Sequence, residues 1–104
     1  MSRHIDLSNK LTNERPTITI GGNTYEVNDE KSNVLMMNQK LKEGGSEAEI
    51  VDKVITLLLG EKALKEIDAM GYGISQYMTI FYALIACVND ITIEEAQERF
   101  QNQK

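Results

Sequence analysis

The sequence predicts a mainly α-helical domain in which a small N-terminal β-hairpin precedes a compact bundle of about five short helices. Three observations lead to this fold class. β-Branched residues alternate before a Gly-Gly-Asn turn, apolar residues then recur every three to four positions, and two capping boxes mark helix starts. A chain of 104 residues, 41% of them hydrophobic, fits one globular domain.

The hairpin is expected over residues 17–27. Its first strand is Thr17-Ile18-Thr19-Ile20, and its second strand carries Tyr25 and Val27. The intervening Gly21-Gly22-Asn23 supplies the positive φ angles that a tight turn requires. Two strands alone are marginal in water, so the hairpin must pack on helices or add to another sheet, such as that of a neighbouring subunit.

Residues 1–16 are predicted to form a flexible N-terminal arm, because the segment from Ser8 to Pro16 is polar and rich in turn formers. Ile5 and Leu7 alternate with polar neighbours, a pattern that also suits a short strand. The arm therefore either stays mobile or becomes ordered on a partner.

Three helical segments are expected between the hairpin and residue 70. Residues 30–43 form the first, capped by Asn28 or Asp29 and ended by Gly44-Gly45. The capping box Ser46-Glu47-Ala48-Glu49 opens the second, in which Ser46 and Glu49 can each bond the other's backbone N–H. Gly60 either ends that helix or only kinks it before the helical segment 61–70.

The stretch Tyr72–Asp90 is predicted to be the central helix, beginning at Gly73 or Ser75, since it is uncharged up to its last residue. Its apolar stripe comprises Tyr77, Ile80, Phe81, Leu84, Ile85 and Val88. A second capping box at Thr92 opens a last helix through Phe100, on which Glu95 and Arg99 can pair. Residues 101–104 are expected to fray.

Charge and cysteine content restrict the possible partners and the location. The net charge is −5 and lies entirely outside residues 1–27, which disfavours direct binding of nucleic acid. A lone Cys87 fits a reducing cytoplasm. With no signal peptide and no apolar run of membrane-spanning length, we expect a cytoplasmic protein without membrane contact.

No reactive constellation emerges from the sequence. His4 is the single histidine and lies in the arm, so it has no fixed partner, and Cys87 lies in the apolar central helix. Carboxylate clusters occur at helix starts, where capping and the helix dipole account for them: Glu47, Glu49, Glu94, Glu95 and Glu98. We therefore expect a protein that is not an enzyme and has no catalytic residue, metal or cofactor.

The order of elements resembles a known family. An Ile-Thr-Ile-Gly-Gly-Asn-Thr-Tyr-Glu-Val opening (residues 18–27) precedes short amphipathic helices, Leu-Leu-Gly-Glu-Lys-Ala (58–63), the aromatic helix around 77–88, and Glu-Glu-Ala-Gln-Glu-Arg-Phe (94–100). Over residues 17–100 this is similar to the small tail assembly chaperones of long-tailed, siphovirus-type phages and prophages of Gram-positive bacteria.

The resemblance implies a helical protein that is made in the infected cell and is absent from the finished virion. Such proteins coat the tape measure protein, keep it soluble and recruit tail tube subunits. Many exist in a short form and a frameshifted longer form, and the present chain would correspond to the short form. The family has no catalytic residues to transfer to this sequence.

Binding by such a chaperone requires exposed apolar side chains, any of which can instead belong to the core. The candidates for partner binding or self-association are Ile18, Ile20, Met36, Met37, Leu41, Leu59, Ile91 and Phe100. The strand edge at residues 17–20 can pair with a neighbour and make a homo-oligomer. The alternative is a small acidic regulatory or adaptor protein, similar in role to an antitoxin or inhibitor, that binds a basic partner.

Overall fold

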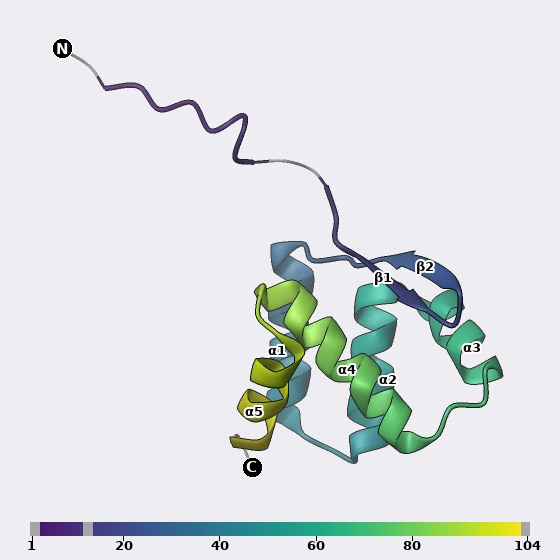
Figure 1. Ribbon diagram of the computed structural model, residues 1–104. Coiled ribbons are helices and arrows are strands. Elements are labelled where there is room, and N and C mark those ends of the chain that lie inside the picture. Colours follow the sequence, from purple (N-terminus) through teal and green to yellow (C-terminus); the bar gives the residue numbers. More distant parts are fainter. Residues whose placement is uncertain (1–2, 12–13, 103–104) are drawn as a thin grey trace.

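The computed structural model describes residues 3–11 and 14–102. It confirms the predicted fold class, a mainly α protein with a small N-terminal hairpin (Figure 1). The elements in chain order are β1 (Thr17–Ile20), β2 (Asn23–Glu26), α1 (Lys31–Glu43), α2 (Glu47–Leu59), α3 (Glu61–Ala69), α4 (Ile74–Asn89) and α5 (Ile93–Asn102).

Helices α2 and α4 form the middle of the bundle. Helix α2 packs against α1, α3 and α4, and α4 also packs against α5. The hairpin lies across the end of the bundle near α3, while α5 lies on the opposite side, beside α1 (Figure 1).

The hairpin forms as the alternation predicts. Ile18 pairs with Tyr25 and Ile20 with Asn23, which leaves a two-residue turn in which Gly21 and Gly22 have φ of 57° and 86°. Its inward face packs on the helices. The Asn28 N–H donates to the Leu58 carbonyl at 2.8 Å, which ties the end of the hairpin to the end of α2.

Glycine decides one question that the sequence left open. Gly60 has φ of 99° and ψ of 162°, so it ends α2 and starts α3 instead of kinking one continuous helix. Its N–H donates to the Thr56 carbonyl at 3.0 Å. This arrangement lets α3 turn back and pack on α2.

The predicted capping box at Thr92 forms in both directions, whereas at Ser46 only the bond from the Glu49 N–H forms among the described residues. Ser46 Oγ accepts from the Glu49 N–H at 3.2 Å, and Thr92 Oγ1 accepts from the Glu95 N–H at 3.1 Å. Helix α4 begins after Gly73, whose N–H donates to Gln76 Oε1 at 2.6 Å. The glycine is therefore the cap, and the alternative start at Ser75 is not used.

Two smaller predictions about the helices are wrong. The residue that caps α1 is Glu30, without a side-chain cap bond, and Asn28, two residues earlier, accepts through Oδ1 from the Glu30 N–H. The ion pair between Glu95 and Arg99 does not form within residues 14–102, since the Glu95 carboxylate accepts from the Thr92 N–H at 3.4 Å.

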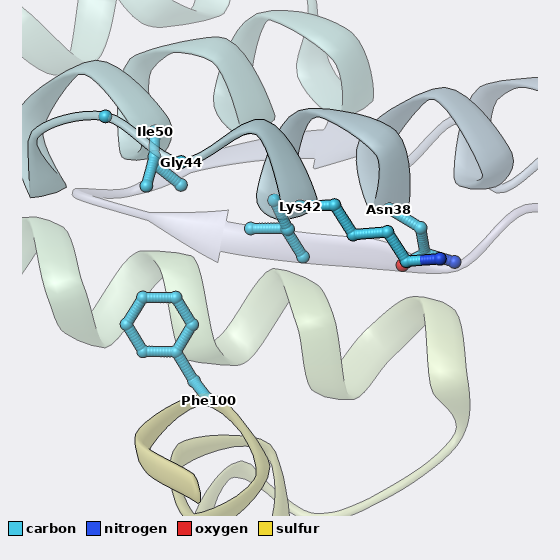
Figure 2. Close-up of a pocket in the computed structure, with 7 residues that line it drawn as sticks. Asn38, Lys42, Gly44, Ile50 and Phe100 are labelled. Atoms are coloured by element: carbon cyan, nitrogen blue, oxygen red, sulfur yellow. The ribbon is translucent and has the colours of Figure 1, made fainter. Parts of the chain in front are cut away.

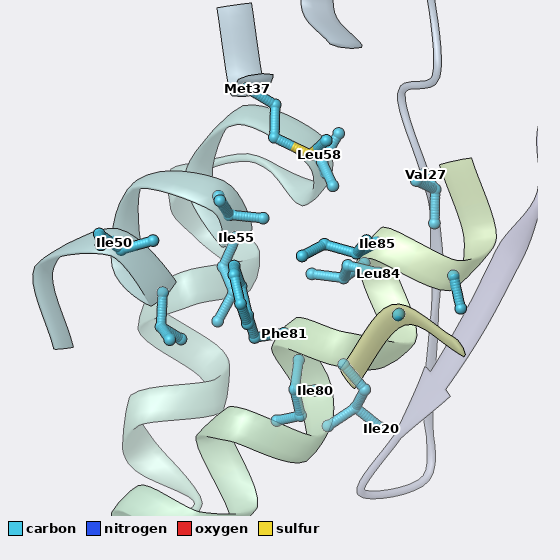
Figure 3. Close-up of a cluster of buried hydrophobic side chains, with 14 of the residues drawn as sticks. Ile20, Val27, Met37, Ile50, Ile55, Leu58, Ile80, Phe81, Leu84 and Ile85 are labelled. Carbon is cyan, nitrogen blue, oxygen red and sulfur yellow. The ribbon is translucent and has the colours of Figure 1, made fainter. Parts of the chain in front are cut away.

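The core lies between α2 and α4, with contributions from α1, α3 and the hairpin (Figure 3). Phe81, Leu84 and Ile55 are fully buried at its centre, as the stripe on the central helix predicts. Tyr77 and Val88, at the two ends of that stripe, are half-buried. The remaining large, fully buried side chains are Met37, Leu58, Ile67, Val27, Val51 and Val54.

The N-terminal segment, over residues 3–11 and 14–16, contains no helix or strand. It runs away from the bundle (Figure 1) and leaves Ile5 79% and Leu11 71% exposed. The chain joins the domain at Arg15, whose Nη2 lies 2.7 Å from Glu30 Oε1. Residues 1–2 and 12–13 of the predicted arm lie outside the described residues.

Helix α5 continues through residues 101 and 102, the first two of the four residues for which the sequence predicts fraying. The capping box at Thr92 fixes the start of α5, and Phe100 packs edge-on against Phe81 near its end. Helix α5 is therefore held at both ends. Residues 103–104 lie outside the described part of the chain.

Candidate functional site

The candidate site is a groove of about 800 Å³. It lies between the C-terminal end of α1, the loop that follows it, the start of α2, and α5 (Figure 2). Its lining residues are Asn38, Leu41, Lys42, Gly44, Gly45, Ile50 and Phe100.

Two glycines shape one wall of the groove. Gly44 and Gly45 have φ of 76° and 126°, which other residues rarely adopt, and they reverse the chain between α1 and α2. Because neither has a side chain, this wall is thin. Lys40 and Lys42 lie in the last turn of α1, where a positive charge complements the helix dipole.

Phe100 forms the opposite wall. Its ring lies edge-on to Phe81 with centroids 5.0 Å apart, and 5.9 Å from the ring of Tyr82. These contacts anchor Phe100 on α4, while its remaining surface lines the groove opposite Ile50 (Figure 2). A smaller cavity of about 140 Å³, also lined by Met37, Leu41 and Phe100, shows that α1 and α5 are not closely packed.

The arrangement suits binding of apolar side chains better than chemistry. Leu41 and Phe100 offer carbon surface beside the edge of the buried Ile50, and Asn38 and Lys42 offer polar groups at the rim. A groove with this lining can accept a ridge of apolar side chains from an amphipathic helix.

The structure brings two of the eight predicted binding residues into this groove, Leu41 and Phe100, both half-buried. Met36 is 48% exposed on the other side of α1, as predicted from the helical period. Ile18, Leu59 and Ile91 are half-buried against the core and do not line the groove.

Met37 and Ile20 are buried, with 0% and 7% of their surfaces exposed. Met37 is completely buried, because it shares the inward face of α1 with Val34 and Leu41, and Ile20 faces the helices from β1. For both residues, alternation or helical period already places the side chain on the inward face.

Several exposed or groove-lining residues were not predicted. Leu35 is 57% exposed beside Met36. The helical period of α1 could have predicted this exposure, because it places Leu35 away from the inward face. Ile50 is buried, and no sequence signal shows that its edge lines a groove. The other large hydrophobic residues that are exposed are Ile5, Leu7, Leu11, Ile74 and Ile93.

The ionisable groups do not converge on the groove. Burial raises the pKa of Tyr77 to about 12, helped by its hydrogen bond to the Asp68 carboxylate on α3. Burial, followed by the charge of Asp68, raises the pKa of Asp52. Burial, followed by the charge of Asp29, raises the pKa of Cys87, which keeps this thiol protonated and weakly nucleophilic.

The carboxylates considered above for catalysis are all exposed. Glu47 and Glu49 lie in the first turn of α2 and Glu94 and Glu95 in the first turn of α5, whereas Glu98 lies one turn later. Within residues 3–11 and 14–102, no group of three His, Cys, Asp or Glu side chains is placed to hold a metal ion.

Comparisons with known proteins give no relative. No family model matches the chain, and neither the curated proteins nor the solved structures yield a match. In the described part of the chain, no single helix has the length and apolarity to cross a membrane; α4 and α5 satisfy both criteria only as a pair, which is bent by 105°.

Proposed function

We propose that this protein is a non-enzymatic phage tail assembly chaperone. In this role it binds helical segments of the tape measure protein, keeps that protein soluble and helps to recruit tail tube subunits. It acts in the cytoplasm of the infected cell and is not retained in the virion. The resemblance over residues 17–100 supports this assignment.

The observation that carries the proposal is the groove between α1, α2 and α5. A tape measure protein is a long, largely helical and apolar chain, so its chaperone must cover ridges of apolar side chains. The groove offers the half-buried side chains of Leu41 and Phe100 for such a ridge. The acidic remainder of the surface keeps a complex in solution, since the net charge is −5.

Co-expression tests the chaperone role. A tape measure gene found next to the gene for this protein is expressed with and without it, and the fraction of the tape measure protein in the soluble extract is measured. We expect a clear increase in that fraction with this protein present. Equal insolubility in both cases would contradict the proposal.

A matched pair of variants tests the groove. Asn38 is an exposed residue of the groove wall, whereas its neighbour Gln39 is also exposed and does not line the groove. Asn38→Trp fills the groove without removing a core contact, and Gln39→Trp adds the same indole elsewhere on α1. We expect the first to abolish solubilisation and the second to preserve it.

Self-association is part of the proposal, because a chaperone that coats a long chain must repeat along it. Light scattering on the purified protein then gives the mass of a multimer. A strict monomer up to high concentration would contradict this part while leaving tape measure binding to be tested separately.

One observation favours the second candidate, a small acidic adaptor or inhibitor of a basic protein. The net charge of the chain is −5, and the excess of acidic residues lies outside residues 1–27. Such a surface would attract a basic partner. This function predicts a monomer that forms a one-to-one complex weakened by salt, and a multimer without such a ligand would count against it.

A further inference from the structure

The outer edge of β1 has unpaired backbone groups. In an antiparallel pair, opposite residues alternate between hydrogen-bonded and non-hydrogen-bonded pairs. The Val27 N–H donates to the Pro16 carbonyl, so the hydrogen-bonded residues of β1 are Ile18 and Ile20. The N–H and C=O groups of Thr17 and Thr19 consequently point the other way. No hydrogen bond to these groups is formed within the described residues.

An uncharged groove of about 300 Å³ runs along this edge. One side is β1, from Ile18 to Gly21, and the other is the first half of α4. A strand added to β1 would lay its inward side chains on α4, on the same face as Ile18 and Ile20. The residues of α4 and the preceding loop in this groove are Tyr72, Gln76, Thr79, Ile80 and Ala83.

The opposite edge of the hairpin is less suited to an apolar strand. The hollow beside β2, of about 470 Å³, is lined by the charged residues Arg15 and Glu26 and by the last turn of α2. Charged side chains on an edge strand discourage the addition of another strand. The β1 edge is therefore the one that an apolar segment would join.

The N-terminal arm has the matching pattern. Ile5 and Leu7 alternate with His4 and Asp6, and these two apolar side chains are 79% and 49% exposed. Residues 3–7 carry no regular structure, and the arm points away from its own bundle (Figure 1). In a strand, Ile5 and Leu7 would share one face, and the two charged or polar residues would share the other.

We propose that residues 3–7 of one copy add as a third strand to the outer edge of β1 in a second copy. Ile5 and Leu7 then occupy the uncharged groove over α4, while His4 and Asp6 face water. The contact joins two different surfaces, so it repeats from copy to copy and builds a ring or an open filament. This contact specifies how the proposed self-association occurs, so it rests on that part of the proposed function. It does not depend on which partner the assembly binds.

Two proline variants test the edge. Thr19 and Thr24 lie directly opposite each other, their hydroxyls 3.0 Å apart, and each directs its N–H away from the partner strand. Each substitution removes the same contact between hydroxyls. Thr19→Pro also removes an N–H from the outer edge of β1, whereas Thr24→Pro removes one from the outer edge of β2. We expect Thr19→Pro to weaken self-association by about tenfold or more and Thr24→Pro to leave it unchanged, by light scattering across concentrations.

Substitutions in the arm test the same contact if Thr19→Pro fails to fold. Ile5 and Leu7 are exposed, so replacing both with Ser leaves the bundle intact but should dissociate the multimer, whereas replacing His4 and Asp6 with Ser should not. A disulfide between Leu7→Cys and Thr79→Cys, in a Cys87→Ser background, should link two chains.

Three outcomes would overturn the inference. A multimer that responds equally to Thr19→Pro and Thr24→Pro would reject strand addition while leaving self-association and tape measure binding in place. A disulfide formed within one chain would show that the arm folds back on its own domain. A wild-type monomer at every concentration would remove both this contact and the proposed self-association.

Discussion

The centre of the bundle and its α1–α5 margin use similar side chains with different results. At the centre, Phe81, Leu84 and Ile55 are fully buried between α2 and α4. At the margin, Leu41 and Phe100 remain half-buried around a groove of about 800 Å³. The two regions share one aromatic contact, between Phe81 and Phe100.

The difference lies in how many elements cover each side chain. Helix α4 is apolar on most sides and is flanked by α2, α5 and the hairpin. Helix α5 is short and covered mainly by α4, and the Gly44-Gly45 loop has no side chain to close the opening. Apolar surface therefore stays accessible at the margin for a partner to cover.

The largest effect should come from truncation at the centre. Phe81→Ala removes a fully buried ring and leaves a cavity, so we expect a loss of about 3–5 kcal/mol in the free energy of unfolding. Urea denaturation followed by circular dichroism measures it. A loss below about 1 kcal/mol would show that the centre is not closely packed.

Truncation at the margin should cost less. Phe100→Ala loses two ring contacts but vacates a space that already opens to solvent, so we expect a loss of about 2 kcal/mol. The same denaturation experiment measures it beside Phe81→Ala. Equal losses for the two variants would contradict the distinction between centre and margin.

The hydrogen bond from Tyr77 to Asp68 predicts a smaller effect that depends on pH. Because the folded state raises the pKa of Tyr77 to about 12, its contribution to stability is complete below the ordinary pKa of about 10 and is lost as the pH rises through 12. We expect wild type to lose more stability than Tyr77→Phe across this window. The free energy of unfolding of both proteins is measured by urea denaturation between pH 10 and pH 12. Equal losses of stability in the two proteins would contradict this contribution.

The smallest effect should come from exposed apolar residues of α1. Leu35→Ser and Met36→Ser remove side chains that are 57% and 48% exposed, so we expect changes within about 0.5 kcal/mol. Thermal unfolding of both variants checks this. A larger loss from either would place that side chain in the core.

Much of this fold could be predicted because its signals are local. The Gly21-Gly22 turn, the caps at Ser46 and Thr92 and the stripe on α4 each depend on residues close together in the sequence. Helical period likewise separated Met36 from the inward face of α1. These features need no knowledge of how the helices pack.

The groove could not be predicted, because it depends on where two distant helices come to lie. Asp90 adopts a left-handed conformation with φ of 53°, and α5 leaves α4 at 105°. That angle brings Phe100 opposite Ile50. The apolar periodicity of α2 places Ile50 on the inward face. That periodicity does not show that the edge of this buried side chain lines a groove.

The most direct test of the central claim is a nuclear magnetic resonance titration with an amphipathic helical peptide from the tape measure protein. The account predicts that the largest amide shifts occur around the groove, at Leu41, Gly44, Gly45 and Phe100, and that Asn38→Trp suppresses them. Shifts confined to the exposed face of α3, or none at all at saturating peptide, would contradict it.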